Sequence, residues 1–107
     1  MKKFTIAEAI NLHVSENTDY SRMFEQNAFD LGFYRPSRVD KQTPHSRDEL
    51  YIIAAGSGDF VCGGETRSFS PGDIFFVPAG VEHQFIKFSS DFATWVVFFG
   101  KGEISEA

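Results

Sequence analysis

The residues from Gly72 to His83 indicate the fold more specifically than any other part of the chain. They read as a glycine, an apolar run, a proline and a glycine two positions apart, and then a histidine. Because proline fixes one backbone angle and glycine tolerates left-handed conformations, Pro78 and Gly80 predict a tight reversal between two strands. At ordinary residue frequencies this spacing would arise by chance in fewer than about one chain of this length in a thousand. The stretch therefore predicts a strand, a turn and a second strand that begins at His83.

The same succession of short strands and turns continues over most of the chain. Apolar and aromatic runs are bounded by glycine, proline or asparagine, a pattern typical of antiparallel sandwiches and barrels. The strands that we expect are 21–26, 30–35, 49–55, 59–62, 66–69, 74–77, 83–88 and 93–99. Residues 6–12 predict at most a short helical turn or two at the N-terminus, and residues 36–44 predict a polar loop. The pattern as a whole predicts an all-β fold.

Length and composition narrow the class of protein. A chain of 107 residues fits a single domain, expected to span residues 1–107, and its 13 phenylalanines suit a packed β core. The net charge is −5 and there is no basic run, which excludes the electrostatic pattern of a nucleic-acid-binding protein. No apolar stretch is long enough to predict a membrane-spanning helix. Cys62 is the only cysteine, so no internal disulfide is expected and a cytoplasmic location is natural.

The stretch that ends at His83 resembles the second sequence motif of the cupin superfamily. Four of its residues match that motif in type and spacing, namely Gly72, Pro78, Gly80 and His83. Lys87 stands at the final position, where the motif has asparagine. The resemblance implies an antiparallel jelly-roll β-barrel, a double-stranded β-helix of the RmlC-like type, over about 32–100 of the chain.

An earlier stretch resembles the first cupin motif, G-x5-H-x-H-x3,4-E-x6-G. His45 matches its second histidine, Glu49 its glutamate and Gly56 its closing glycine. Thr43 stands in place of the first histidine, and Ser37 in place of the leading glycine. The resemblance thus covers most of the motif but leaves one of its metal-ligand positions without a histidine.

The two motifs together imply a divalent metal ion inside the barrel, held by His45, Glu49 and His83. Two imidazoles and one carboxylate suit borderline divalent ions, and this set does not distinguish iron, manganese, nickel and zinc. It leaves coordination positions open to water, substrate or dioxygen. With Thr43 at the first position we expect weaker binding than in a four-ligand site. Thr43 could contact the ion through a water, or Gln42 could offer a carbonyl oxygen.

Strand alternation adds two candidates for catalysis. Alternate residues of a strand share a face, so Tyr51 is expected to point inward with Glu49, and Lys87 with His83. Tyr51 could then assist proton transfer. A buried Lys87 would need an anion, either a substrate carboxylate or Glu49, because desolvating an unpaired charge is costly. The alternative is that the Lys87 stem lies along the barrel while its ammonium stays in water.

Three functional interpretations follow, and the first is the one that we favour. The first is a metal-dependent enzyme of the dioxygenase or isomerase/lyase type that acts on a small polar acid or carbonyl compound. The second is a barrel that binds a sugar or an acid as a sensor, without turnover. In the third, Glu49 pairs with Arg47 or Lys87, and the barrel is a structural module without metal.

A homodimer is expected in each case. Alternation places several large apolar side chains on one outer face, where a monomer would expose an unusually large hydrophobic patch. These residues are Leu50, Ile52, Phe76, Trp95 and Val97.

Overall fold

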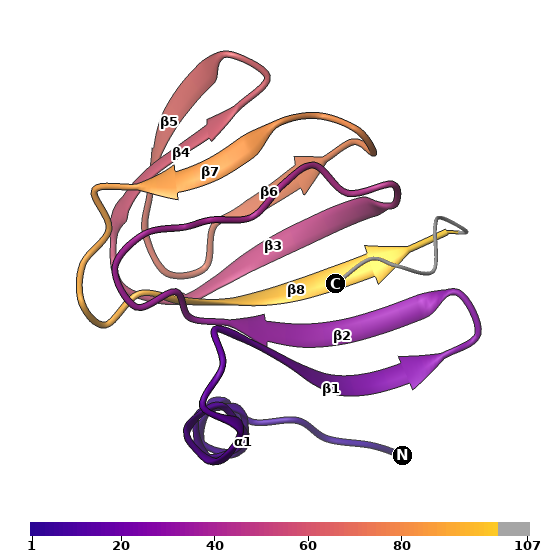
Figure 1. Ribbon diagram of the computed structural model, residues 1–107. Coiled ribbons are helices and arrows are strands. Elements are labelled where there is room, and N and C mark those ends of the chain that lie inside the picture. The colour runs from indigo at the N-terminus through magenta and orange to yellow at the C-terminus, as the bar shows by residue number, and fades with distance from the viewer. Residues whose placement is uncertain (101–107) are drawn as a thin grey trace.

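The chain folds into two antiparallel sheets that face each other, with one helix beside the larger sheet (Figure 1). The computed structural model describes residues 1–100. The larger sheet has the strand order β1-β2-β8-β3-β6 and the smaller has the order β5-β4-β7. The strands are β1 (Tyr20–Gln26), β2 (Phe29–Tyr34), β3 (Asp48–Ala55), β4 (Gly58–Cys62), β5 (Glu65–Phe69), β6 (Ile74–Val77), β7 (His83–Ile86) and β8 (Ala93–Phe99). All paired strands are antiparallel, which confirms the all-β jelly-roll fold.

Turn residues separate the strands where the sequence indicated. Gly63 and Gly64 connect β4 to β5 as a two-residue loop, with Cys62 paired to Glu65 across it. Both glycines have positive φ, 58° and 82°, as a hairpin turn matched to the twist of its strands requires. The predicted strand boundaries therefore differ from the observed ones by only a few residues.

The N-terminal helix is longer than the predicted turn or two. Helix α1 covers Ile6–Glu16, and Thr5 caps it by accepting a hydrogen bond from the backbone of Glu8 at 3.1 Å. Glu8 in turn accepts from the backbone N–H of Thr5, which completes a capping box. The helix continues to Glu16 and ends where Asn17 adopts the left-handed conformation and donates its backbone N–H to the carbonyl of His13 at 3.0 Å. Within the described chain, no helix combines the length and hydropathy of a membrane span.

A cluster of aromatic rings fills the space between the two sheets. Phe85 lies at its centre, with ring centroids 4.4 Å from Phe60 and 4.7 Å from Phe92. Tyr51 contacts Phe85 at 4.9 Å and His83 at 5.9 Å, so it joins the aromatic cluster to the polar residues of the barrel. Each such pair contributes about 0.5–1.5 kcal/mol beyond the burial of its area. The core thus provides a rigid support directly beneath the candidate site.

The predicted inward position of Lys87 is wrong. Strand β7 ends at Ile86, and Lys87 follows it with a φ of 53° and an exposed side chain. The alternation that places His83 and Phe85 inside holds only while the backbone stays extended. The left-handed residue turns the chain at that point, so the lysine faces solvent.

Candidate metal centre

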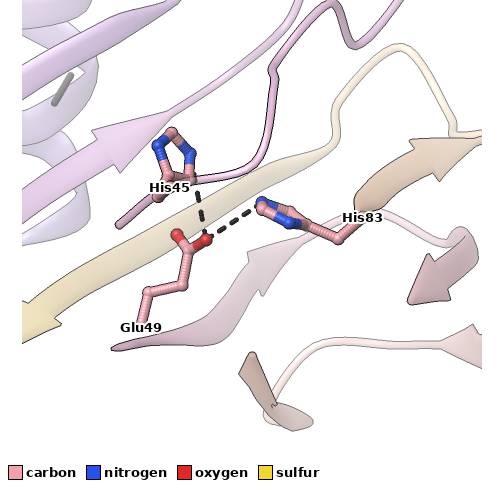
Figure 2. Close-up of side chains that lie close together, drawn as sticks. All are labelled: His45, Glu49 and His83. Carbon is pink, nitrogen blue, oxygen red and sulfur yellow. Dashed lines mark ion pairs between the residues drawn. The ribbon is translucent and has the colours of Figure 1, made fainter. Parts of the chain in front are cut away.

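Three predicted ligands from distant parts of the sequence come together between the sheets (Figure 2). Glu49 lies on the inward face of β3, His83 is the first residue of β7, and His45 lies in the segment before β3. Oε1 of Glu49 is 2.9 Å from Nε2 of His83 and 3.8 Å from Nε2 of His45. One ligand atom of each residue lies within 4.8 Å of the others. The fold therefore assembles the predicted set, and whether it binds a metal stays a prediction.

The turn before His83 is tied to the segment that carries His45. The backbone N–H of Gly80 donates to the carbonyl of His45 at 2.6 Å, and that of Ala79 donates to Oδ1 of Asp48 at 2.8 Å. Asp48, the first residue of β3, is half-buried and holds this turn through that bond. These two hydrogen bonds hold the turn that precedes His83 against the segment that carries His45.

The tautomer of His83 follows from its hydrogen bond to the backbone. Nδ1 of His83 lies 2.9 Å from the carbonyl oxygen of Val81, which can only accept, so Nδ1 carries the hydrogen. In the neutral ring Nε2 then presents a lone pair, and this lone pair faces Glu49. Burial alone would lower the pKa of His83, but the Glu49 carboxylate and the Val81 carbonyl favour the cation and raise the pKa above its ordinary value.

Glu49 is fully buried without a conventional donor. Glu49 is 0% exposed, and while His83 is neutral with its hydrogen on Nδ1, no donor reaches either carboxylate oxygen or Nε2 of His83. Only protonation of Nε2 would turn the 2.9 Å contact between Glu49 and His83 into a hydrogen bond. Burying polar atoms in this way costs free energy unless a cation or a donor satisfies them. The buried carboxylate and the lone pair of His83 therefore favour the binding of a positive charge at this site.

The two cations that the sequence offered as partners of Glu49 lie elsewhere. Arg47 contacts Oδ2 of Asp30 at 3.3 Å, and it donates to the carbonyl oxygens of Ala28 and Phe98 at 2.9 and 3.3 Å. Lys87 is exposed beyond the end of β7. The structural interpretation in which either cation neutralises Glu49 is therefore wrong.

Tyr51 points inward as predicted. It is 1% exposed, and its hydroxyl donates to Oε1 of Gln42 at 2.9 Å. Burial and the nearby Glu49 charge raise its pKa well above the ordinary value, so the hydroxyl keeps its proton at neutral pH. The role of Tyr51 in proton transfer stays a prediction, now with a defined hydrogen-bond acceptor.

Gln42, rather than Thr43, reaches the predicted ligands. Oε1 of Gln42 is 3.3 Å from Nε2 of His45. Thr43 is exposed and lines an outer groove of about 570 Å³ instead. The groove is also lined by Asp40, Lys41, Gln42, Pro44, Val61, Gly64, Glu82, His83 and Gln84. The motif alignment put Thr43 at the missing ligand position, but the side chain that turns inward is Gln42, which the sequence offered as the alternative oxygen ligand.

A small cavity of about 70 Å³ is lined by two of the three candidate ligands, His45 and Glu49. Its lining combines three tyrosines with polar and apolar side chains, namely Tyr20, Tyr34, Gln42, His45, Glu49, Tyr51, Val96 and Phe98. The Tyr20 ring lies over Gly32, where even a Cβ atom would overlap it. The glycine thus makes room for one wall of the cavity, a relationship that the sequence did not reveal.

Asp40 is the buried residue that sequence reasoning missed. It is 2% exposed and accepts hydrogen bonds from the Tyr34 hydroxyl at 2.6 Å and from the Phe85 backbone N–H at 2.8 Å. The side chain of Gln84 donates to its carbonyl oxygen at 2.9 Å. Nothing distinguishes this aspartate from its polar neighbours in the sequence, because its partners come from both sheets.

Comparison with known proteins places this geometry in a family. A model of the cupin domain matches residues 33–99. An uncharacterized protein of Streptomyces coelicolor is 31% identical over 100 residues, which cover 92% of this chain and 95% of that protein.

Solved structures show the same fold. A cupin 2 conserved barrel domain protein from Salinispora arenicola is 21% identical with a TM-score of 0.69, over 94% of this chain and 89% of that one. KdgF from Halomonas sp. is 20% identical with a TM-score of 0.67, over 78% of this chain and 79% of that one. At these identities the likeness concerns the fold.

Proposed function

Because the chain belongs to the cupin domain family, we propose that it binds one divalent metal ion and acts on a small polar acid or carbonyl compound. The ion would be held by His45, Glu49 and His83. One observation carries the proposal: with His83 neutral, three buried acceptor atoms, both oxygens of Glu49 and Nε2 of His83, face one another without a donor. A divalent cation would satisfy all of them.

The residues fit such an ion in chemistry and in spacing. Neutral imidazole and carboxylate are ordinary ligands of zinc, iron, nickel and manganese. Ligands placed about 2.0–2.2 Å from a zinc ion lie roughly 3–4 Å from one another. The separations of Oε1 of Glu49 from the two histidine nitrogens, 2.9 and 3.8 Å, are close to this range.

The surroundings suit a small substrate. When bound, a divalent ion acts as a Lewis acid that polarises a carbonyl or carboxylate oxygen. The adjoining cavity of about 70 Å³ has room for a few waters or for the reacting end of a small ligand. Tyr51 keeps its proton in this setting and is the side chain that we assign to hydrogen bonding or proton transfer. The chemistry of this site suits dioxygenase or isomerase/lyase reactions.

The outer groove favours a second candidate, the binding of a sugar or an acid without turnover. The groove offers about 570 Å³, and its polar side chains include Lys41, Thr43 and Gln84. Amide, hydroxyl and ammonium groups are those that recognise hydroxylated or anionic ligands. This candidate shares the metal site and differs only in the absence of a reaction.

Metal analysis tests the proposal. Purified wild type, incubated with zinc, nickel, iron or manganese and then desalted, should hold about one ion per chain. Glu49→Gln should lose most of it, because the amide brings no charge and one less oxygen ligand. Glu16→Gln is the matched control, since Glu16 is exposed at the end of α1, and it should bind like wild type. A wild type that retains none of the four metals would refute the proposal.

Turnover separates the two candidates. Metal-loaded protein would be incubated with a panel of small hydroxy acids, keto acids and sugars, under air and under nitrogen. Product formation that disappears in Glu49→Gln indicates an enzyme. Binding detected by calorimetry without any product indicates the non-catalytic candidate.

A further inference from the structure

The side chain of Gln42 has a defined orientation in the candidate metal centre. Its Nε2 donates to Oδ2 of Asp40 at 2.7 Å, while its Oε1 accepts from the Tyr51 hydroxyl at 2.9 Å. A carboxylate can only accept, so the amide nitrogen must face Asp40 and the amide oxygen must face the cavity. The oxygen lies 3.3 Å from Nε2 of His45. The hydrogen-bond partners thus exclude the flipped amide.

Asp40 fixes the orientation of the Gln42 side chain, and Asp40 is itself held by hydrogen bonds from residues of both sheets. Its Oδ1 accepts from the Tyr34 hydroxyl at 2.6 Å and from the Gln42 backbone N–H at 3.1 Å. Its Oδ2 accepts from the backbone N–H of Phe85 at 2.8 Å. Tyr34 belongs to β2 and Phe85 to β7, so the carboxylate cannot turn without breaking bonds to both sheets. The Gln42 oxygen is therefore held in place before any ligand arrives.

We propose that Oε1 of Gln42 is a fourth protein ligand of the metal ion and that Asp40 positions it. This inference rests on the proposed function. Of the two lone pairs of the amide oxygen, one accepts from Tyr51 and the other is available to an ion. The separation from Nε2 of His45, 3.3 Å, is that of two ligands of one ion. Gln42 takes the role that the motif alignment gives to Thr43, whose side chain is exposed.

The resulting site has two nitrogen and two oxygen ligands. In the metal-free protein a hydrogen on Nε2 of His45 can point at Oε1 of Gln42. The metal ion would take the place of this hydrogen. Removing the Gln42 oxygen should weaken metal binding by roughly tenfold to a hundredfold, since even partners that only orient ligands change affinity by that factor. Removing the Thr43 hydroxyl should change little.

The test compares wild type with Gln42→Leu and with the adjacent control Thr43→Val. Zinc affinity is measured by competition with a coloured chelator, and Co²⁺ is added to report ligand number through its visible spectrum. Gln42→Leu should bind zinc tenfold to a hundredfold more weakly and alter the cobalt spectrum. Thr43→Val should match wild type in both. Equal affinity and an unchanged spectrum in Gln42→Leu would overturn the inference while the proposed function stands.

A structure of zinc-loaded wild type decides the question even if Gln42→Leu fails to fold. Oε1 of Gln42 should lie about 2.0–2.2 Å from the ion. An ion bound to His45, Glu49 and His83 with this oxygen beyond bonding distance would overturn the inference alone. A wild type that binds no zinc, nickel, iron or manganese would overturn both the inference and the proposed function.

Discussion

Nε2 of His83 lies 2.9 Å from Oε1 of Glu49, although neither atom carries a hydrogen in the neutral tautomer that Val81 imposes. The two atoms come from facing strands, β7 and β3, and the aromatic core beneath them keeps the strands in place. Neither side chain can turn toward water, because each is at most 1% exposed. The fold thus holds two acceptors against each other, and this contact is favourable only when a positive charge lies between them.

Glu49→Gln should therefore stabilise the metal-free protein while abolishing its response to metal. The new amide can donate to Nε2 of His83 and satisfy it, which would recover about 1–3 kcal/mol at alkaline pH. Metal-free wild type keeps a proton on Nε2 at low pH. Its stability should fall as the pH rises through the raised pKa of His83, because the folded state holds that proton more tightly than the unfolded state does.

Thermal unfolding measures both predicted effects, the higher stability of the metal-free variant and its missing response to metal. Metal at about a hundred times its dissociation constant should stabilise wild type by about 2.7 kcal/mol, or roughly 10–20 °C in melting temperature. Glu49→Gln should melt above metal-free wild type at alkaline pH and should not shift with metal. If Glu49→Gln melts below metal-free wild type at alkaline pH, the contact between Glu49 and neutral His83 is not unfavourable, and the prediction is wrong.

The three candidate ligands could be named from the sequence because each occupies a fixed position in one of the two cupin motifs. His83 follows a turn whose proline and glycine fix the backbone, and Glu49 lies in a strand whose alternation is regular. The predicted inward position of Lys87 was wrong because Lys87 itself adopts the left-handed conformation, which ends the strand alternation.

The role of Asp40 was not predictable, because its partners come from two different sheets. Asp40 is buried by Tyr34 and Phe85, residues from opposite sheets that no nearby pattern connects with it. The sequence offered Gln42 as a possible oxygen ligand, but not the bond to Asp40 that orients its side chain. Such contacts depend on how a loop closes over a finished barrel, and residue types alone do not encode that path.

Gly32→Ala should destabilise the protein through Tyr20. A Cβ at residue 32 would overlap the Tyr20 ring, which covers that position on the inward face of the sheet. Overpacking of this kind costs about 1–3 kcal/mol. In a Tyr20→Ala background the added methyl group has space, so the cost should largely vanish. Urea denaturation of the four proteins gives the coupling energy, and strictly additive costs would contradict the assignment.

The tyrosines should resist ionisation until the protein unfolds. Burial raises the pKa of Tyr20 to about 12, and burial together with hydrogen bonding to Asp40 raises that of Tyr34 further. A raised folded-state pKa means that the stabilising contribution is complete below about pH 10 and is lost as the pH rises toward 12. Tyrosinate absorbance should therefore increase together with the loss of the circular dichroism signal. A tyrosine that titrates near pH 10 in folded protein would show that it is solvated.

We expect a homodimer formed through the outer face of the larger sheet. Of the five residues predicted for this face, Leu50 lies opposite Phe76, and Ile52 lies opposite Ile74, a residue not in the predicted set. Trp95 packs instead against Phe33, with ring centroids 5.1 Å apart, and Val97 is half-buried. Ile74 is 61% exposed and Phe76 is 53% exposed. Strand β6 is also at the edge of its sheet, where unpaired backbone groups favour association. A second copy would remove this apolar surface from water.

Light scattering at micromolar concentration measures the association. Wild type should have the mass of two chains, and Phe76→Glu should have the mass of one, because a charge at the centre of an apolar interface would have to be buried unpaired. Val14→Glu makes the same kind of change on α1, where Val14 is 68% exposed, and should remain dimeric. Phe76→Glu should also keep its metal, since residue 76 lies on the outward face of β6 and the ligands lie inside. A monomeric wild type would rule out this dimer.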